Sequence, residues 1–287
     1  MATTQRPARI DEKNSGKVPG KIAVLGAGKM GGILLEGFIR RGVATNVNLR
    51  GTVRHPEKAV EASRRLDVAI DTDNCAAVRA ADVILLCVKP QGIGPILEEV
   101  RNELTPEKLV ISVAASVPIG YIASKVGESV PIIRAMPNTP AMVGYGITAL
   151  CKGDLATDAQ LKVAQALFAS VGKVVVVDEN QMDAVTALSA SGPAYMFIIL
   201  ESLAEAGVKV GLPRELATQL AAQTALGSAQ MVLQTGHHPA MLKDVVTTPA
   251  GCTIDGILEL EEGGLRVTLI KAVVKAAQRA KELLLKD

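Results

Sequence analysis

The 287-residue sequence has few aromatic side chains: Phe, Trp and Tyr make up 2% of it, and Trp is absent. Proteins that bind single-stranded nucleic acid stack bases on aromatic side chains, so this class is disfavoured. An excess of one charge is also lacking, because 31 Lys and Arg residues stand against 29 Asp and Glu residues. This balance gives no strong field for nucleic acid or an anionic membrane. We therefore expect neither as a partner.

Histidine and cysteine are scarce as well. Three histidines are too few to favour a His-based triad or a multi-His metal centre, and the four cysteines form no CxxC pair. Scattered thiols are typical of a reducing compartment and not of a disulfide framework or a zinc site. We expect no bound metal and a cytoplasmic location. The residues concerned are His55, His237, His238, Cys75, Cys87, Cys151 and Cys252.

Long uninterrupted apolar runs are missing. Residues 1–19 are polar and lack the apolar segment of a signal peptide, which predicts a flexible tail. The most apolar later run, Pro193 to Val208, is interrupted by Glu201 and Glu205. We interpret this run as a buried helix and not as a membrane span.

A glycine motif follows the first apolar strand, Lys21 to Leu25. It reads Gly26-Ala27-Gly28-Lys29-Met30-Gly31 and leads into a helical pattern that ends near Gly42. In this strand–turn–helix context, Gly-x-Gly-x-x-Gly is the signature of a dinucleotide-binding site. The first glycine permits the tight turn, the second lets a pyrophosphate approach the backbone, and the third lets the helix pack on the strand.

The end of the second strand, residues 47–53, predicts which dinucleotide is bound. NAD enzymes usually place Asp or Glu there to bind the ribose 2′-hydroxyl, but no acid occurs before Glu57. Arg54 offers a cation for a 2′-phosphate, and Thr52 could add a hydroxyl. We therefore expect NADPH, with NADH possible.

Strands and helices alternate as far as residue 180, which predicts a doubly wound, Rossmann-type sheet over residues 20–180. One strand, Val83 to Val88, is apolar on both faces, as a central parallel strand should be, and Lys89-Pro90 follows it at the ligand-binding edge. A rigid turn around Asn138 and Thr139 either holds its own loop in place, as a staple, or faces the nicotinamide. Further strands are expected at 68–70, 109–113, 130–135, 143–151 and 173–177, and helices at 56–65, from 74, and at 93–103, 118–126 and 158–171.

No strand pattern occurs after residue 178, so residues 181–287 are expected to form an all-α C-terminal dimerisation domain. Its helices are apolar on several sides and need partners beyond one another. Breaks are expected at Ser189–Pro193, at 211–213 and at 236–239.

The stretch Thr247 to Gly264 joins a small-residue turn to a helical pattern, whose free amides would suit a small carboxylate. The alternative is an ordinary helix start with Thr253 as its cap.

Lys243 is the main candidate for a catalytic base, although Asp244 suggests a surface ion pair. Because an iminium accepts hydride without a strong acid, this composition favours imine reduction. The other candidate hydroxyls are those of Ser189, Ser191, Thr247 and Thr248.

Several motifs in this order resemble those of the pyrroline-5-carboxylate reductases. They are Gly26-Ala-Gly-Lys-Met30, Val88-Lys-Pro-Gln91, Met136-Pro-Asn-Thr-Pro140, the run from Asp183 to Tyr195, and Lys243 to Gly256 followed by Leu260-Glu261. The resemblance spans residues 20–285 and implies NAD(P)H-dependent reduction of 1-pyrroline-5-carboxylate to L-proline, the last step of proline biosynthesis. It also implies a homodimer that often assembles into decamers, with the substrate site across the dimer.

The resemblance implies roles for individual residues. Thr253 would hydrogen-bond the imine nitrogen, and Thr248 with the amides of Gly251, Cys252 and Thr253 would hold the carboxylate, with Ser191 in the same substrate-binding set. The cofactor would be lined by Gly26, Gly28, Lys29, Met30, Gly31, Arg54, Asn74, Val88, Lys89 and Pro90, with Asn138 and Thr139 near the nicotinamide.

Two positions depart from the family pattern. Ala190 stands where the family often has Gly within Ser-Gly-Ser-Gly-Pro, and Ala250 stands within a frequent Pro-Gly-Gly. Each adds one methyl group beside the expected pocket. Two other hypotheses remain: a dehydrogenase of the β-hydroxyacid or arogenate type, and a non-catalytic NADPH-binding regulator.

Overall fold

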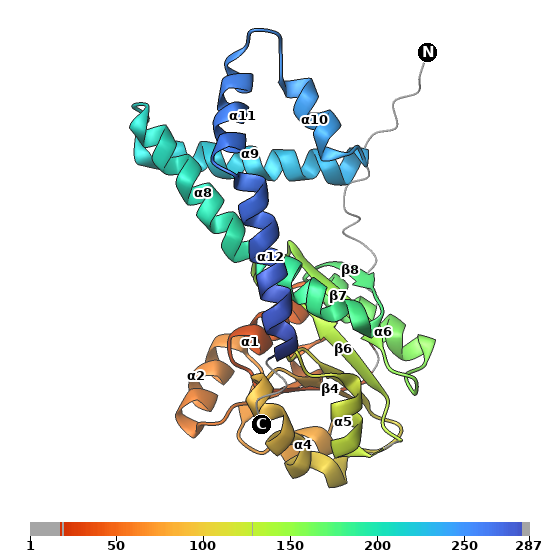
Figure 1. Ribbon diagram of the computed structural model, residues 1–287. Coiled ribbons are helices and arrows are strands. Elements are labelled where there is room, and N and C mark those ends of the chain that lie inside the picture. Colours follow the sequence, from red (N-terminus) through yellow and green to blue (C-terminus); the bar gives the residue numbers. More distant parts are fainter. Residues whose placement is uncertain (1–17, 19, 128, 283–287) are drawn as a thin grey trace, which may run out of the picture. The chain divides into compact units, whose positions relative to one another are not determined.

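The computed structural model describes residues 18, 20–127 and 129–282 (Figure 1). These residues divide into two compact units, one of residues 18–191 with 276–282, the other of residues 192–275. Most of the predicted tail lies outside the described residues. Val18 does not behave as a tail residue, because it is buried and its backbone N–H donates to the Val43 carbonyl at 2.9 Å.

The first unit contains an eight-stranded sheet in the order β3-β2-β1-β4-β5-β6-β7-β8. The central strands β1, β4 and β5 are buried throughout, which explains why their sequences are apolar on both faces. The predicted doubly wound, Rossmann-type fold is confirmed. The strands are β1 Ile22–Leu25, β2 Leu49–Thr52, β3 Ala69–Asp71, β4 Val83–Leu86, β5 Leu109–Ser112, β6 Ile132–Met136, β7 Gly146–Lys152 and β8 Gly172–Val176.

One strand direction was not foreseen. β7 is antiparallel to β6, with Met136 opposite Ala149, whereas all other neighbouring strands are parallel. The physical reason is the connection, which holds only the short 3-10 helix Thr139–Val143. A parallel return needs a crossover of a dozen or more residues, so this chain must turn back on itself.

Helices cover both faces of the sheet and create two apolar cores. Alternate side chains of β1 enter opposite cores, as the two-residue strand period requires. Phe38 and Phe168 fill the core under α1, α2 and α6, while Leu97 and Ile122 belong to the core under α3, α4 and α5. The helices are α1 Lys29–Arg40, α2 Pro56–Leu66, α3 Asn74–Arg79, α4 Ile93–Val100, α5 Ile119–Val126 and α6 Asp158–Ala169.

The second unit is helical, and its predicted breaks at 211–213 and 236–239 are confirmed. Gly211 and Gly236 both have positive φ, and Pro213 and Pro239 stand at the starts of the following helices. The helices are α8 Gly192–Lys209, α9 Arg214–Thr235, α10 Pro239–Val246, α11 Cys252–Glu262 and α12 Leu265–Glu282, of which residues 276–282 group with the first unit.

The predicted break at Ser189–Pro193 is wrong, because one helix continues from Glu179 to Lys209. It contains α7, Met182–Val185, and then a π-helical turn over Thr186–Ala190 that leads into α8. The Ser191 N–H bonds to the Thr186 carbonyl at 3.0 Å, five residues back. The wider turn lets the helix pass Pro193 without ending. Such turns are rare and occur often at functional sites.

The expected burial of the apolar run 193–208 is also wrong for the single chain. Phe197 is 63% exposed and Ile198 62%, and in α8 only Ala204 is buried. By length and composition, the helix Glu179–Lys209 is the one helix among the described residues that could cross a membrane. A sequence pattern cannot tell whether an apolar helix face is covered by its own chain or by another molecule.

Candidate active site

The glycine turn between β1 and α1 has the geometry that its motif predicts. Gly26 has φ +96°, and a Cβ there would lie 2.8 Å from a methyl of Val88. A Cβ on Gly31 would collide with the Gly26 carbonyl oxygen, so the third glycine permits the close approach of helix and strand. Gly28, in contrast, has nothing within 4 Å of its Cβ position. The backbone at Gly28 is therefore open to a ligand.

The N-terminus of α1 is suited to an anion. Gly28 is the N-cap, no side chain caps the helix, and its first turn contains no acid. Lys29 is exposed and Met30 half-buried at this end. Uncapped backbone N–H groups and the helix dipole favour a phosphate here, so the turn fits the pyrophosphate of a dinucleotide.

The end of β4 lies beside this turn. The Cys87 N–H donates to the Leu25 carbonyl at 2.8 Å, which places half-buried Val88 against Gly26. Lys89 is exposed, and Pro90 begins a 3-10 turn. Burial raises the pKa of the Cys87 thiol to about 12, so it stays protonated and takes no part as a nucleophile.

Two polar side chains at the end of β2 have different environments: Thr52 bonds within the protein, and Arg54 is open to a ligand. The Thr52 hydroxyl is buried and donates to Asn74 Oδ1 at 2.6 Å, so the idea that it reads a 2′-phosphate is wrong. The Asn74 amide donates to Glu99 Oε2 at 2.9 Å. Glu99 thus helps to orient Asn74, a role that nothing in the sequence pattern indicates. Arg54 is exposed and bonds to no other described residue.

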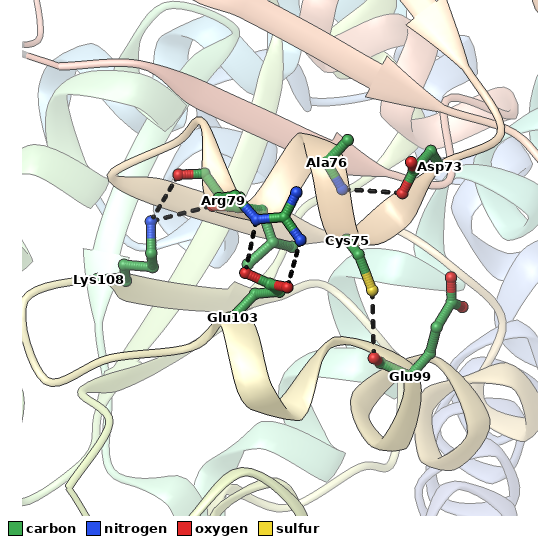
Figure 2. Close-up of polar contacts among 8 residues, drawn as sticks. Asp73, Cys75, Ala76, Arg79, Glu99, Glu103 and Lys108 are labelled. Atoms are coloured by element: carbon green, nitrogen blue, oxygen red, sulfur yellow. Dashed lines mark hydrogen bonds and ion pairs between the residues drawn. The ribbon is translucent and has the colours of Figure 1, made fainter.

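Helix α3 is held at both ends and so fixes Asn74, its first residue (Figure 2). At its start, Asp73 accepts the Ala76 N–H at 2.8 Å. At its end, the Lys108 ammonium donates to the carbonyls of Val78, Arg79 and Ala81. The same view shows the two hydrogen bonds from Arg79 to Glu103 and the Cys75 Sγ facing the Glu99 carbonyl.

Replacing Lys108 with methionine is expected to lower the free energy of unfolding by about 1–2 kcal/mol, because the α3 carbonyls lose a charged donor. The apolar stem is retained, so packing changes little. Chemical denaturation checks this result. Lys162→Met, on the exposed face of α6, is the control and should have no measurable effect. Equal effects of the two substitutions would contradict the capping role.

The turn after β6 is a staple. Asn138 is 8% exposed, and its Oδ1 accepts the Ile147 N–H at 3.0 Å. Its amide nitrogen donates to the Ser189 carbonyl at 3.1 Å. These bonds confirm the staple, while a position of Asn138 and Thr139 near the nicotinamide stays a prediction. Thr139 is half-buried in the following 3-10 turn.

The five candidate hydroxyls differ in whether they already make a hydrogen bond. Those of Ser189 and Thr247 bond to carbonyls four residues back, at 3.0 and 2.9 Å, and so are committed to their own helices. The hydroxyls of Ser191, Thr248 and Thr253 make no hydrogen bond within the described part of the chain. These three therefore remain free to bind a ligand. They are the three that the sequence resemblance assigns to the substrate.

Thr253 is not the cap of α11. The N-cap is Gly251, with Cys252 first in the helix and Thr253 second, and no side chain caps this end. A Cβ on Gly251 would lie 2.5 Å from the Thr248 hydroxyl oxygen, so a side chain there would displace that hydroxyl. Uncapped amides and two free hydroxyls can together hold a carboxylate and a polar ring atom.

The two departures from the family pattern have different surroundings. Ala190 packs against the small apolar cluster of Met136, Ala149, Cys151 and Met182, so its methyl group points into protein. Ala250 is exposed and has φ +58°, a left-handed conformation that an L-residue adopts at a cost of about 1–2 kcal/mol. The methyl group at Ala250 thus strains the turn.

Lys243 is unsuited to act as a base. Its ammonium lies 3.0 Å from the Asp244 carboxylate, and both side chains are well exposed, as a surface pair should be. Among the described residues, no group of three or more His, Cys, Asp or Glu side chains could hold a metal ion.

The Rossmann-type sheet with an open glycine turn, together with separate uncapped amides and hydroxyls, defines the class as a dinucleotide-dependent oxidoreductase. Residues 21–116 match the family model described as NADP oxidoreductase coenzyme F420-dependent, and residues 179–283 match pyrroline-5-carboxylate reductase dimerisation. The chain belongs to the pyrroline-5-carboxylate reductase family, as its relatives show.

Two relatives with that name come from Methanosarcina acetivorans and Glycine max. The first is 44% identical over 92% of this chain and 97% of its own length. The second is 43% identical over 91% and 95%. The crystal structure of Plasmodium falciparum pyrroline carboxylate reductase with NADP bound has a TM-score of 0.85 and 32% identity, and covers 93% of this chain and 98% of that one. The relatives thereby rule out the hypothesis of a dehydrogenase of the β-hydroxyacid or arogenate type.

Proposed function

We propose that this chain reduces 1-pyrroline-5-carboxylate to L-proline with NADPH, and that Thr253 is its catalytic residue. The observation that carries the proposal is the free Thr253 hydroxyl in the first turn of α11, beside uncapped amides and the free Thr248 hydroxyl. Relatives over 40% identical carry the name of this reaction. The free Ser191 hydroxyl belongs to the same substrate-binding set.

Each group has a defined task in this reaction. NADPH, when bound, supplies the hydride that adds to the ring carbon of the C=N bond. The amides of Cys252 and Thr253 hold the substrate carboxylate, aided by the helix dipole and by the Thr248 hydroxyl. The Gly251 N–H already bonds to the Thr248 carbonyl at 3.1 Å and so shapes the turn. The Thr253 hydroxyl accepts the N–H of the protonated ring nitrogen and orients the C=N bond. Since this nitrogen already carries its proton, hydride addition alone gives the amine.

The cofactor is held by groups of the first unit. The amides at Gly28 to Gly31 would bind the pyrophosphate, and Val88, Lys89 and Pro90 would line the dinucleotide. Asn74 would bond the ribose with its remaining amide hydrogen. Thr139 and Asn138 would lie near the nicotinamide, with the Asn138 side chain directed at Ser189 and Ile147.

Replacing Arg54 with alanine is expected to raise the KM for NADPH about tenfold while the KM for NADH changes little. The guanidinium is exposed and uncommitted, so its removal affects only the 2′-phosphate. Steady-state rates with each cofactor measure the effect. The control is Arg50→Ala, an exposed arginine on β2. A proportional rise for both cofactors would show that Arg54 does not read the phosphate.

The first test of the reaction is oxidation of NADPH in the presence of 1-pyrroline-5-carboxylate, followed by the absorbance of the reduced nicotinamide. We expect rapid turnover and formation of L-proline. NADPH binding without turnover would instead support the regulator. A six-membered cyclic imine acid, assayed in parallel, tests the ring size that the site accepts.

Assembly and location belong to the same proposal. The match to a dimerisation domain, together with the exposed apolar side chains of α8, supports a homodimer. The free cysteines support a reducing compartment such as the cytoplasm. A decamer would be the higher assembly. Light scattering of the purified protein distinguishes monomer, dimer and decamer.

A further inference from the structure

The π-helical turn creates a backbone problem at Ser189. In a regular helix, the carbonyl of residue 189 accepts the N–H of residue 193. Residue 193 is proline, which has no N–H and whose ring crowds the carbonyl four residues earlier. The Ser189 carbonyl therefore lacks its α-helical donor. A buried carbonyl without a partner costs as much as a lost hydrogen bond.

The missing donor comes from outside the helix. Asn138 Nδ2 donates to the Ser189 carbonyl at 3.1 Å, while Asn138 Oδ1 accepts the Ile147 N–H at 3.0 Å. The side chain is 8% exposed, and prolines at 137 and 140 stiffen the turn that carries it. Asn138 thus connects the turn after β6, the start of β7 and the π-helical turn.

The π-helical turn determines where the free Ser191 hydroxyl lies. Two other hydroxyls in this segment bond within the helix, Thr186 to the Met182 carbonyl at 2.8 Å and Ser189 to the Val185 carbonyl at 3.0 Å. The Ser191 N–H closes the wide turn. A shift from the π-helical to the α-helical hydrogen-bond pattern would rotate Ser191 about the helix axis, because the two patterns differ by one residue.

We propose that Asn138 is a positioning residue, which replaces the missing N–H of Pro193 and so holds the π-helical turn that orients Ser191. The inference rests on the proposed function for the role of Ser191 in binding the imine substrate. It assigns to Asn138 an effect on substrate binding that does not depend on contact with the cofactor.

The test is a double-substitution cycle of Asn138→Asp, Pro193→Ala and the two together. Aspartate keeps the acceptor for Ile147 but offers no N–H to Ser189, whereas alanine at 193 restores a backbone N–H. We expect Asn138→Asp to raise the KM for 1-pyrroline-5-carboxylate about tenfold with less than about a twofold change in the Kd for NADPH. Adding Pro193→Ala should recover most of the loss, so the two effects are not additive.

Controls separate this role from general damage. Asn102→Asp makes the same chemical change on an exposed turn and should leave both constants unchanged. Asn138→Ala, which has no added charge, should reproduce the rise in KM if the missing donor is its cause. A matched rise in the Kd for NADPH without recovery by Pro193→Ala would overturn the proposal, as would a lowered Tm with unchanged kinetics.

Hydrogen exchange provides a readout that does not need turnover. The amides of residues 186–191 should exchange faster in Asn138→Asp and return towards the wild-type rate in the double variant. Unchanged exchange would overturn the proposal even in an active enzyme. If wild-type protein binds NADPH but does not reduce the imine, the proposed function fails, while the exchange measurement still decides the role of Asn138.

Discussion

Thr253→Ala is expected to lower kcat/KM for 1-pyrroline-5-carboxylate by more than about tenfold while the affinity for NADPH is kept. The reason is that the Thr253 hydroxyl is uncommitted and stands in the first helical turn after Gly251. Its loss removes the group that orients the C=N bond, and nothing in the glycine turn changes. Steady-state kinetics and a separate NADPH titration measure the two quantities.

Two further variants make this prediction specific. Thr253→Ser retains a hydroxyl and should keep most of the activity. Thr247→Ala removes a hydroxyl that already bonds to the Lys243 carbonyl, so it should have a small effect on kcat/KM. Full turnover by Thr253→Ala would exclude Thr253 from the reaction and leave the neighbouring amides as the remaining candidates.

Gly31→Ala and Gly28→Ala should both weaken NADPH binding, but for different physical reasons. At Gly31 a methyl group collides with the Gly26 carbonyl, so the free energy of unfolding should fall by about 1–3 kcal/mol. The turn cannot move freely, because the N–H groups of Gly26 and Ala27 both bond to the Thr52 carbonyl. NADPH binding should weaken as well, since the turn is displaced.

At Gly28 the same methyl group meets no protein atom, but φ −78° and ψ −143° form a combination that lies outside the regions that alanine prefers. The free energy of unfolding should therefore fall by the cost of this backbone conformation alone, about 1–3 kcal/mol. The Kd for NADPH should rise about tenfold or more, because the methyl group occupies ligand space. Denaturation and fluorescence titration of both variants provide the comparison. If Gly28→Ala bound NADPH normally, the pyrophosphate could not lie against this residue.

Periodicity and glycine spacing were sufficient to predict the elements of the first unit, because they report directly on backbone conformation and burial. The direction of β7 was not predictable from its own residues, since it follows from the length of the connection after Met136. The continuous helix past Pro193 was missed for a similar reason. A proline predicts a break unless an outside donor, here Asn138, satisfies the carbonyl that it leaves free.

The hydrogen-bond partners of individual side chains also could not be predicted from the sequence. The sequence put Thr52 beside the cofactor because the residue stands at the end of β2, but its hydroxyl is directed at Asn74. Of the five candidate hydroxyls, only the hydrogen-bond geometry identifies which are free. A sequence pattern tells which face a residue occupies, while the partner of a hydroxyl depends on residues far away in the chain, such as Glu99, the second partner of Asn74.

The antiparallel pairing of β6 with β7 also has a consequence for the order of folding. Met136 pairs with Ala149 across a short turn, whereas Leu25 must find Leu86 across two intervening strands and three helices. Short closures cost less entropy and form sooner. We expect the β6–β7 pair to form early. The glycine turn should reach its final conformation late, because the Cys87 N–H must first reach the Leu25 carbonyl. A segment that leaves the ribosome before β6 and β7 would then become able to bind its nucleotide only after that pair has formed.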